Sequence, residues 1–134
     1  MHVLRSSSVY ETEPVGEITD QRDFYNAVTE VETSLDPHSL LATCKRIERE
    51  LGRAPGGPRH GPRPIDVDLL IVDGVTTTDE ELVLPHPEVT IRRFVLAPLL
   101  ELEPDLALPD GTRLAGALAS LGSDQRAMPV GRLD

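Results

Sequence analysis

The sequence predicts an α+β fold, in which an antiparallel-rich sheet packs against helices. Three observations predict it. Residues 3–12 and 24–33 contain the β-branched and aromatic side chains that are typical of strands. Apolar residues recur at helical spacing after Asp36. A continuous apolar run at residues 69–72 is typical of a buried central strand.

The first two strands are expected at residues 3–12 and 24–33. The first strand runs into a segment that contains proline and glycine, which is turn chemistry. Glu30 and Glu32 lie at the far end of the second strand, so that end is expected to be solvated or functional. Because strand side chains alternate, three residues before them share the same face: Phe24, Asn26 and Val28.

The clearest helix is expected to begin at Asp36-Pro37 and to end at Gly52. Asp36 can accept hydrogen bonds from the free amides of the first turn, and Pro37 suits the first helical position. Six residues then recur at helical spacing: Leu40, Leu41, Cys44, Ile47, Glu48 and Leu51.

A loop is expected at residues 53–64, because this stretch contains four prolines and three glycines. It also contains three arginines and a histidine, which makes it a candidate functional loop. The alternative is a disordered basic connector. A third strand is expected at residues 65–72, closed by a hairpin turn at Asp73-Gly74.

Two further helices are expected after the third strand. The first covers residues 90–102, with a kink or break at Pro98. The second is short and covers residues 112–121. The whole chain, residues 1–134, is expected to form a single domain in which residues 122–134 are a flexible tail.

The composition argues against several classes of function. The net charge of −10 argues against a general nucleic-acid binder. The only cysteine is Cys44, so no internal disulfide can form. No apolar run approaches the length of a membrane span. We therefore expect a cytoplasmic protein with no nucleic-acid partner and no membrane partner.

The basic residues are unevenly distributed. Six of the thirteen fall between Lys45 and Arg63. A local basic patch on an acidic protein suits a small polyanion better than a long one. The alternative is a solvated helix face followed by a basic loop.

Two aspartates in the expected third strand are the sharpest chemical feature. Asp66 and Asp68 are two positions apart, so in a strand their carboxylates project from the same face. Two such charges repel each other, and a divalent cation relieves that repulsion. Mg²⁺ commonly binds one or two carboxylates together with substrate phosphates. The alternative is that both aspartates are simply solvated at a strand end.

Arginines close to these aspartates could neutralise the remaining phosphate oxygens. His86, between two prolines, could bond a phosphate or a metal-bound water, and a structural histidine bonded to backbone is the alternative. The sequence has no P-loop pattern. It therefore favours MgATP binding and a phosphoryl-type transfer, with four candidate arginines: Arg53, Arg59, Arg63 and Arg92.

The order of these segments resembles the 6-hydroxymethyl-7,8-dihydropterin pyrophosphokinase family of folate biosynthesis. The resemblance runs from about residue 6 to residue 111, and residues 61–70 look like the signature of that family. The matching segments in order are residues 7–16, 24–28, 32–35, 47–48, 52–53, 59–70, 85–87 and 92–99.

The resemblance implies a transferase that moves pyrophosphate from ATP to the hydroxymethyl group of the pterin and releases AMP. Asp66 and Asp68 would bind two Mg²⁺ ions. Arg53, Arg63 and Arg92 would act in catalysis by stabilising phosphates. The nucleotide would also be bound by Arg59 in the loop and by four further residues: Leu41, Glu48, Leu69 and His86.

The resemblance also implies a pterin pocket. The ring would lie between Phe24 and Phe94, and Asn26 would bind its polar edge. Thr12 and Val15 would contribute to the same pocket. Stacking on aromatic rings with a fixed amide is sound recognition chemistry for a flat heterocycle.

For the fold, the resemblance implies a ferredoxin-like sheet that lacks the first strand-helix unit of the family. The chain begins after the Gly-Ser-Asn-Leu segment with which the family usually opens. This leaves two alternatives to the enzyme open: a non-catalytic remnant that binds the nucleotide or the pterin, and a subunit completed by a partner chain. The sequence leaves monomer or dimer undetermined.

Overall fold

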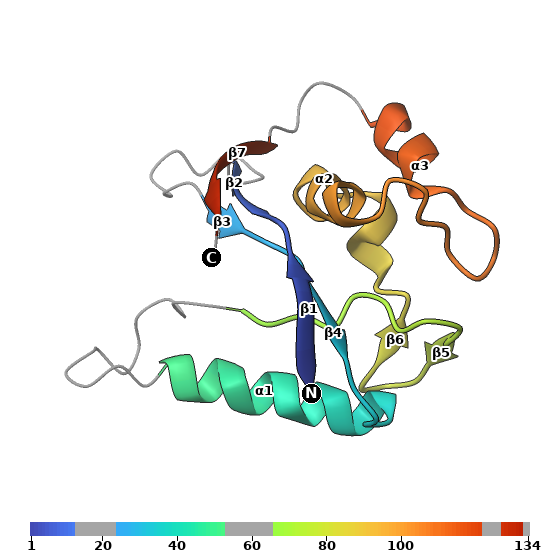
Figure 1. The fold of residues 1–134 in the computed structure, drawn as a ribbon. Helices are drawn as coiled ribbons and strands as arrows, with labels where there is room; N and C mark the ends of the chain where they lie inside the picture. Colours follow the sequence, from blue (N-terminus) through green and yellow to red (C-terminus); the bar gives the residue numbers. More distant parts are fainter. Residues whose placement is uncertain (13–23, 53–65, 122–126, 133–134) are drawn as a thin grey trace. The chain divides into compact units, whose positions relative to one another are not determined.

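The computed structural model describes residues 1–12, 24–52, 66–121 and 127–132 (Figure 1). The chain is divided into two units. The first unit comprises Met1–Thr33 and Pro87–Asp134, and the second comprises Ser34–His86.

The strands of the first unit are all paired antiparallel in the described residues. β1 and β4 form one sheet, and β2 lies between β3 and β7 in the other. The strands of this unit in the described residues are β1 (His2–Ser6), β2 (Ser8–Thr12), β3 (Phe24–Asn26), β4 (Thr29–Glu32) and β7 (Ala127–Arg132).

Each of the two long strands predicted at residues 3–12 and 24–33 is divided in two, and Ser7 accounts for the break. Ser7 is fully buried, and its N–H donates to the Val28 C=O at 2.8 Å. Its Oγ accepts the Val28 N–H at 2.9 Å and donates to the Ser8 C=O at 2.8 Å. A side chain therefore supplies bonds that a regular ladder would supply, and the predicted face of Phe24, Asn26 and Val28 is interrupted before Val28.

Helix α2 (Arg93–Leu102) begins three residues later than the predicted helix. A separate 3-10 turn, η1 (Pro87–Thr90), precedes it, and Arg92 is extended at the helix start. The helix continues through Pro98 and is not broken there. Its buried residues are Val95, Leu96, Pro98 and Leu99.

The core of the first unit lies where α2 meets its neighbours. α2 packs against β2 and against α3 (Leu114–Ser120), as Figure 1 shows. Leu96 and Leu114 are completely buried there. Full burial of a leucine side chain contributes about 1.5–3 kcal/mol, so these contacts hold α2 on the sheet.

The predicted flexible tail, residues 122–134, contains strand β7. β7 pairs with β2 and lies at the edge of its sheet. Pro129 is tolerated there because an edge strand can lack one ladder donor. A register shift on β2 between Val9 and Tyr10 accompanies this pairing.

The second unit is built on α1 (Pro37–Gly52), whose bounds agree closely with the prediction. The Asp36 carboxylate accepts hydrogen bonds from the Ser39 N–H and hydroxyl, as expected of a helix cap. These bonds lower the pKa of Asp36. Leu40 and Glu48 are the buried residues of the helix.

The prediction of a strand at residues 65–72 is wrong for the part that the structure describes, residues 66–72. No strand pairing forms there. Instead, the Val67 N–H donates to a side chain of α1, and the Leu70 C=O accepts the His86 N–H at 2.8 Å. An apolar run becomes a strand only where another strand offers a matching ladder.

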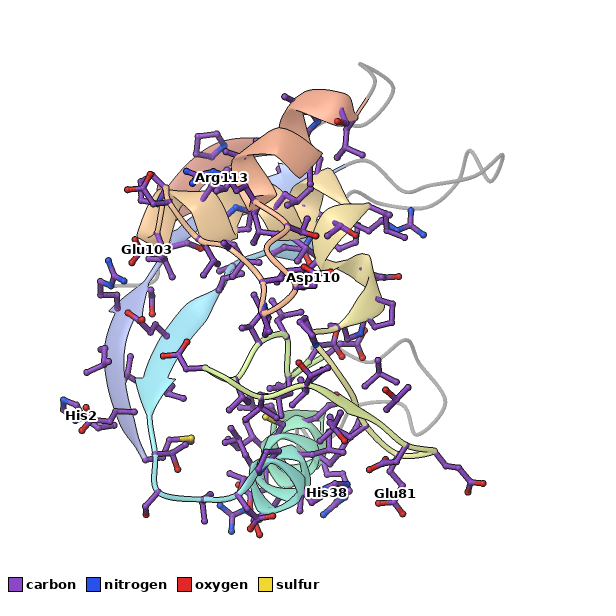
Figure 2. The ribbon with its side chains drawn as sticks, turned by 90° about the vertical axis from the view of Figure 1, so that its right-hand side faces the viewer. His2, His38, Glu81, Glu103, Asp110 and Arg113 are labelled. Carbon is purple, nitrogen blue, oxygen red and sulfur yellow. The ribbon has the colours of Figure 1, made fainter. Side chains whose placement is uncertain are left out.

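The turn predicted at Asp73-Gly74 is present, with the Val75 N–H bonded to the Val72 C=O at 3.0 Å and Gly74 at φ +70°. The strands that follow are β5 (Thr77–Thr78) and β6 (Val83–Leu84), which pair with each other. His38 Nε2 on α1 lies 2.8 Å from Asp79 Oδ2 in the connection between them (His38 is labelled in Figure 2).

The described residues therefore form a mixed α/β protein with three α-helices and antiparallel sheets. This agrees with the predicted α+β class. None of the helices in these residues is both long and apolar enough to cross a membrane.

Candidate active site

The predicted metal-binding aspartates flank a residue that is anchored to α1. Asp66 and Asp68 are exposed, whereas Val67 between them is half-buried. The Val67 N–H donates to Glu48 Oε2 at 3.0 Å. The exposure alternates as it does along a strand, although no strand forms. Both carboxylates are thus accessible to a cation from solvent.

Glu48 has a role that the sequence did not reveal. The residue is 5% exposed, and its carboxylate accepts the backbone N–H of Val67 between the two aspartates; its place in the nucleotide site stays a prediction. A buried carboxylate is costly unless it accepts hydrogen bonds. One signal was available, since Glu48 occupies an otherwise apolar helical position.

The pKa of the Cys44 thiol on α1 depends on burial and on nearby charges. Burial is the main effect, and it raises the pKa of Cys44. Lys45 lowers that pKa, whereas the charges of Asp68 and Glu48 raise it further. The raised pKa keeps the half-buried Cys44 thiol protonated near neutral pH.

His86 is held beside the same segment by its backbone. Its N–H donates to the Leu70 C=O at 2.8 Å, and the residue is half-buried. Leu69 and Leu41 are also half-buried in this unit. The structure thus places six predicted site residues in the second unit: Leu41, Glu48, Asp66, Asp68, Leu69 and His86.

The donor set suits a cation that takes most of its ligands from elsewhere. Within residues 1–12, 24–52, 66–121 and 127–132, no three His, Cys, Asp or Glu side chains form a group that could hold a metal ion. Asp66 and Asp68 supply oxygen ligands only. Mg²⁺ fits such a pair, because it commonly binds one or two carboxylates and completes its shell with water and phosphate oxygens.

The predicted pterin residues belong to the first unit. Thr12 in β2 lies opposite Phe24 in β3, and Tyr10 lies opposite Asn26. Phe94 is half-buried on α2, which packs against β2. Strand pairing and helix packing therefore bring Thr12, Phe24, Asn26 and Phe94 into one unit.

Glu101 connects α2 to β2 and was not predicted. Its Oε2 accepts the Ser8 N–H at 2.8 Å and the Ser8 hydroxyl at 3.2 Å, and its Oε1 accepts the Tyr10 hydroxyl at 2.7 Å. Tyr10 is buried. Burial, and then the Glu101 carboxylate, raise the pKa of Tyr10 to about 12.

Arg92 is the predicted catalytic arginine that the structure describes. It precedes α2, and its Nε lies 3.7 Å from Glu88 Oε1. That Nε is buried and makes no hydrogen bond within the described part of the chain. The other predicted site residues lie outside the described residues: Val15, Arg53, Arg59 and Arg63.

Comparison with known proteins gives a consistent result. Residues 1–104 match the family described as 7,8-dihydro-6-hydroxymethylpterin-pyrophosphokinase. The chain is 46% identical over 121 residues to a 2-amino-4-hydroxy-6-hydroxymethyldihydropteridine pyrophosphokinase of Methylorubrum extorquens, which covers 90% of this chain and 75% of that relative.

Two further relatives are a Bacillus subtilis enzyme of the same name and an Arabidopsis thaliana folate synthesis bifunctional protein. The first is 46% identical over 100 residues, which is 75% of this chain and 59% of the relative. The second is 47% identical over 100 residues, which is 75% of this chain. The chain spans only 20% of the length of that bifunctional protein.

Proposed function

The chain belongs to the 7,8-dihydro-6-hydroxymethylpterin-pyrophosphokinase family, and on this premise we propose that it transfers pyrophosphate from ATP to 6-hydroxymethyl-7,8-dihydropterin and releases AMP. The observation that carries the proposal is the exposed pair Asp66 and Asp68 on either side of the anchored Val67. This pair offers what a MgATP site needs, namely two accessible carboxylates on a fixed backbone.

In the proposed nucleotide site, Asp66 and Asp68 would hold two Mg²⁺ ions, which would neutralise phosphate charge when bound. Arg53, Arg63 and Arg92 stabilise the charge that develops on the transferred group. Glu48 acts by fixing the Val67 backbone. The remaining nucleotide contacts are assigned to Leu41, Arg59, Leu69 and His86.

In the proposed reaction, the hydroxymethyl oxygen of the pterin attacks the β-phosphorus of ATP. A new oxygen–phosphorus bond forms, the bond between the β-phosphorus and its oxygen bridge to the α-phosphate breaks, and AMP leaves with that oxygen. The hydroxyl proton is released to solvent. The arginines contribute mainly by positioning and charge neutralisation, as is usual in phosphoryl transfer.

In the proposed pterin site, Asn26 bonds the polar edge of the ring, and Phe24 and Phe94 stack on its faces. Thr12 and Val15 complete the pocket. The pairing of Thr12 with Phe24 supports this assignment, as does the packing of α2, which carries Phe94, against β2.

The finer details of fold and setting are part of the proposal. A ferredoxin-like arrangement is supported by the antiparallel pairing of β1 with β4 and of β2 with β3. The proposal includes a cytoplasmic protein with small-molecule partners and without membrane partners; the net charge of −10 supports the absence of a nucleic-acid partner.

The test is AMP release from MgATP in the presence and absence of 6-hydroxymethyl-7,8-dihydropterin. We expect pterin-dependent AMP formation that falls at least about 100-fold in Asp66→Ala and Asp68→Ala, because charge neutralisation of the polyphosphate is lost. Glu80→Gln is the matched control, since Glu80 is an exposed acid of the same unit. Binding of both substrates without AMP formation would favour a non-catalytic remnant, and full activity of the aspartate variants would refute the metal role.

A further inference from the structure

Hydrogen bonds between α2 and β2 involve a residue that lies outside the proposed pterin pocket. We propose that Glu101 is a positioning residue, which sets the pterin-stacking side chain of Phe94 relative to Asn26 through its hydrogen bonds to Ser8 and Tyr10. This inference rests on the proposed function, because it concerns how the pterin site is assembled.

The first step concerns α2. Phe94 and Glu101 are separated by two helical turns, so both lie on the same side of the helix. The rise of an α-helix puts them about 10 Å apart along its axis. The side of α2 that Glu101 fixes to β2 is therefore the side that carries Phe94.

The second step concerns β2. Glu101 bonds the backbone and hydroxyl of Ser8 and the hydroxyl of the buried Tyr10. Tyr10 is the direct partner of Asn26 across the β2–β3 ladder. The contact that orients α2 thus ends on the residue opposite the amide proposed to recognise the pterin.

The third step is the size of the effect. If α2 tilted by about 10° around the position of Glu101, Phe94 would move by roughly 2 Å, given the axial separation of about 10 Å. Misplacements of about 1 Å can reduce catalysis by about 100-fold. Loss of the Glu101 contacts can therefore displace Phe94 far enough to weaken pterin binding, although Glu101 does not contact the pterin.

Arg5 shows that α2 has a separate anchor that does not involve β2. The Arg5 guanidinium donates to the Leu102 C=O at 2.6 Å and to Glu30 at 2.7 Å. Because Leu102 is the last residue of α2, this anchor restrains the C-terminal end of the helix. Loss of Glu101 should then tilt the helix rather than detach it.

The experiment compares Glu101→Ala with Glu103→Ala. Glu103 is an exposed acid just after α2 (Figure 2), and its Oε2 lies 3.7 Å from a guanidinium nitrogen of Arg5. Calorimetry measures the Kd of 6-hydroxymethyl-7,8-dihydropterin with α,β-methylene-ATP present, and the Kd of that analogue alone. For Glu101→Ala we expect the pterin Kd to rise roughly tenfold or more and the analogue Kd to change less than about twofold.

Rescue separates positioning from general stability. In Glu101→Gln, the amide oxygen can accept the Ser8 N–H and the amide NH₂ can donate to the Tyr10 oxygen, so both contacts can be kept. We expect the pterin Kd to return to within about threefold of the wild-type value. If Glu101→Ala does not fold, Tyr10→Phe removes one bond of the same set and should raise the pterin Kd alone.

Three outcomes overturn the proposal: a pterin Kd in Glu101→Ala equal to that of Glu103→Ala, equal losses of both ligands, or no rescue by glutamine. The melting temperature of each variant is recorded, and binding is measured well below it. Failure of the wild-type chain to bind the pterin would instead refute the proposed function, and this inference with it. If the wild-type chain turns over its substrates and Glu101→Ala leaves the pterin Kd unchanged, this inference alone is refuted.

Discussion

Replacing Glu48 by alanine tests the link between α1 and the acidic segment. Glu48 is 5% exposed, and its carboxylate accepts the Val67 N–H at 3.0 Å. A hydrogen bond to a charged group contributes about 1.5–3 kcal/mol. Val67 is half-buried, so water can replace part of the lost bond. We therefore expect the free energy of unfolding to fall by about 2 kcal/mol.

The same substitution should weaken MgATP binding. The backbone between Asp66 and Asp68 loses its anchor, and a loss of about 1.4 kcal/mol in binding free energy corresponds to a tenfold higher Kd. We expect the Kd of magnesium α,β-methylene-ATP to rise about tenfold by calorimetry, with an unchanged Kd for the pterin. Urea unfolding of the same preparations gives the change in stability.

Two variants separate the loss of the hydrogen bond from the loss of a negative charge on α1. Glu50→Ala removes an exposed acid from the same helix, whose closest contact with Arg46 is 4.0 Å, and should change neither quantity. Glu48→Gln keeps an oxygen acceptor for the Val67 N–H and should recover most of both losses. If Glu48→Ala matched Glu50→Ala in stability and in nucleotide affinity, the anchoring role of Glu48 would be refuted.

Three further predictions concern stability. Ser7→Ala should lower the melting temperature by about 5 °C, because the buried hydroxyl that bonds the Val28 N–H is lost; Ser6→Ala, at a partly exposed neighbour, is the control. Hydrogen bonds from two backbone N–H groups lower the pKa of Asp79, so Asp79 stabilises the fold above the unfolded-state pKa of about 3.9 and loses this effect as pH falls through the lower folded-state pKa. Acid unfolding of Asp79→Asn should therefore lack this pH-dependent loss of stability. An acid transition equal to that of the wild type would contradict the prediction. The pKa of Tyr10 is raised to about 12, so its contribution to the free energy of unfolding is complete below about pH 10 and is lost between about pH 10 and 12. Alkaline unfolding of Tyr10→Phe should not show this decrease in stability.

Local sequence signals were sufficient to predict the bounds of α1 and insufficient to predict the bounds of the strands. The Asp36 cap and the glycine at position 52 are properties of short segments, and α1 begins and ends there. The break at Ser7 depends on a bond to Val28, a residue that lies far along the chain. Residues 66–72 have the apolar character of a strand, but strand formation depends on a partner, and none pairs with them in the described residues.

The candidate site shows the same division between local and distant effects. Asp66 and Asp68 are exposed on either side of the half-buried Val67, and all three lie in one short segment; the shared face predicted for the two carboxylates stays a prediction. The bond from Val67 to Glu48 and the bonds of Glu101 to β2 join residues that are distant in the chain. A single sequence contains no signal that pairs residues so far apart in the chain.

The pairing of β7 with β2 has a consequence for synthesis on the ribosome. β2 ends at Thr12 and β7 begins at Ala127, whereas the whole second unit is encoded between them, at Ser34–His86. At usual translation rates, β2 emerges roughly 5–25 seconds before β7 is made. The nascent chain therefore carries a complete second unit while the central strand of the three-stranded sheet still has one open edge, which a chaperone or a neighbouring nascent chain could occupy.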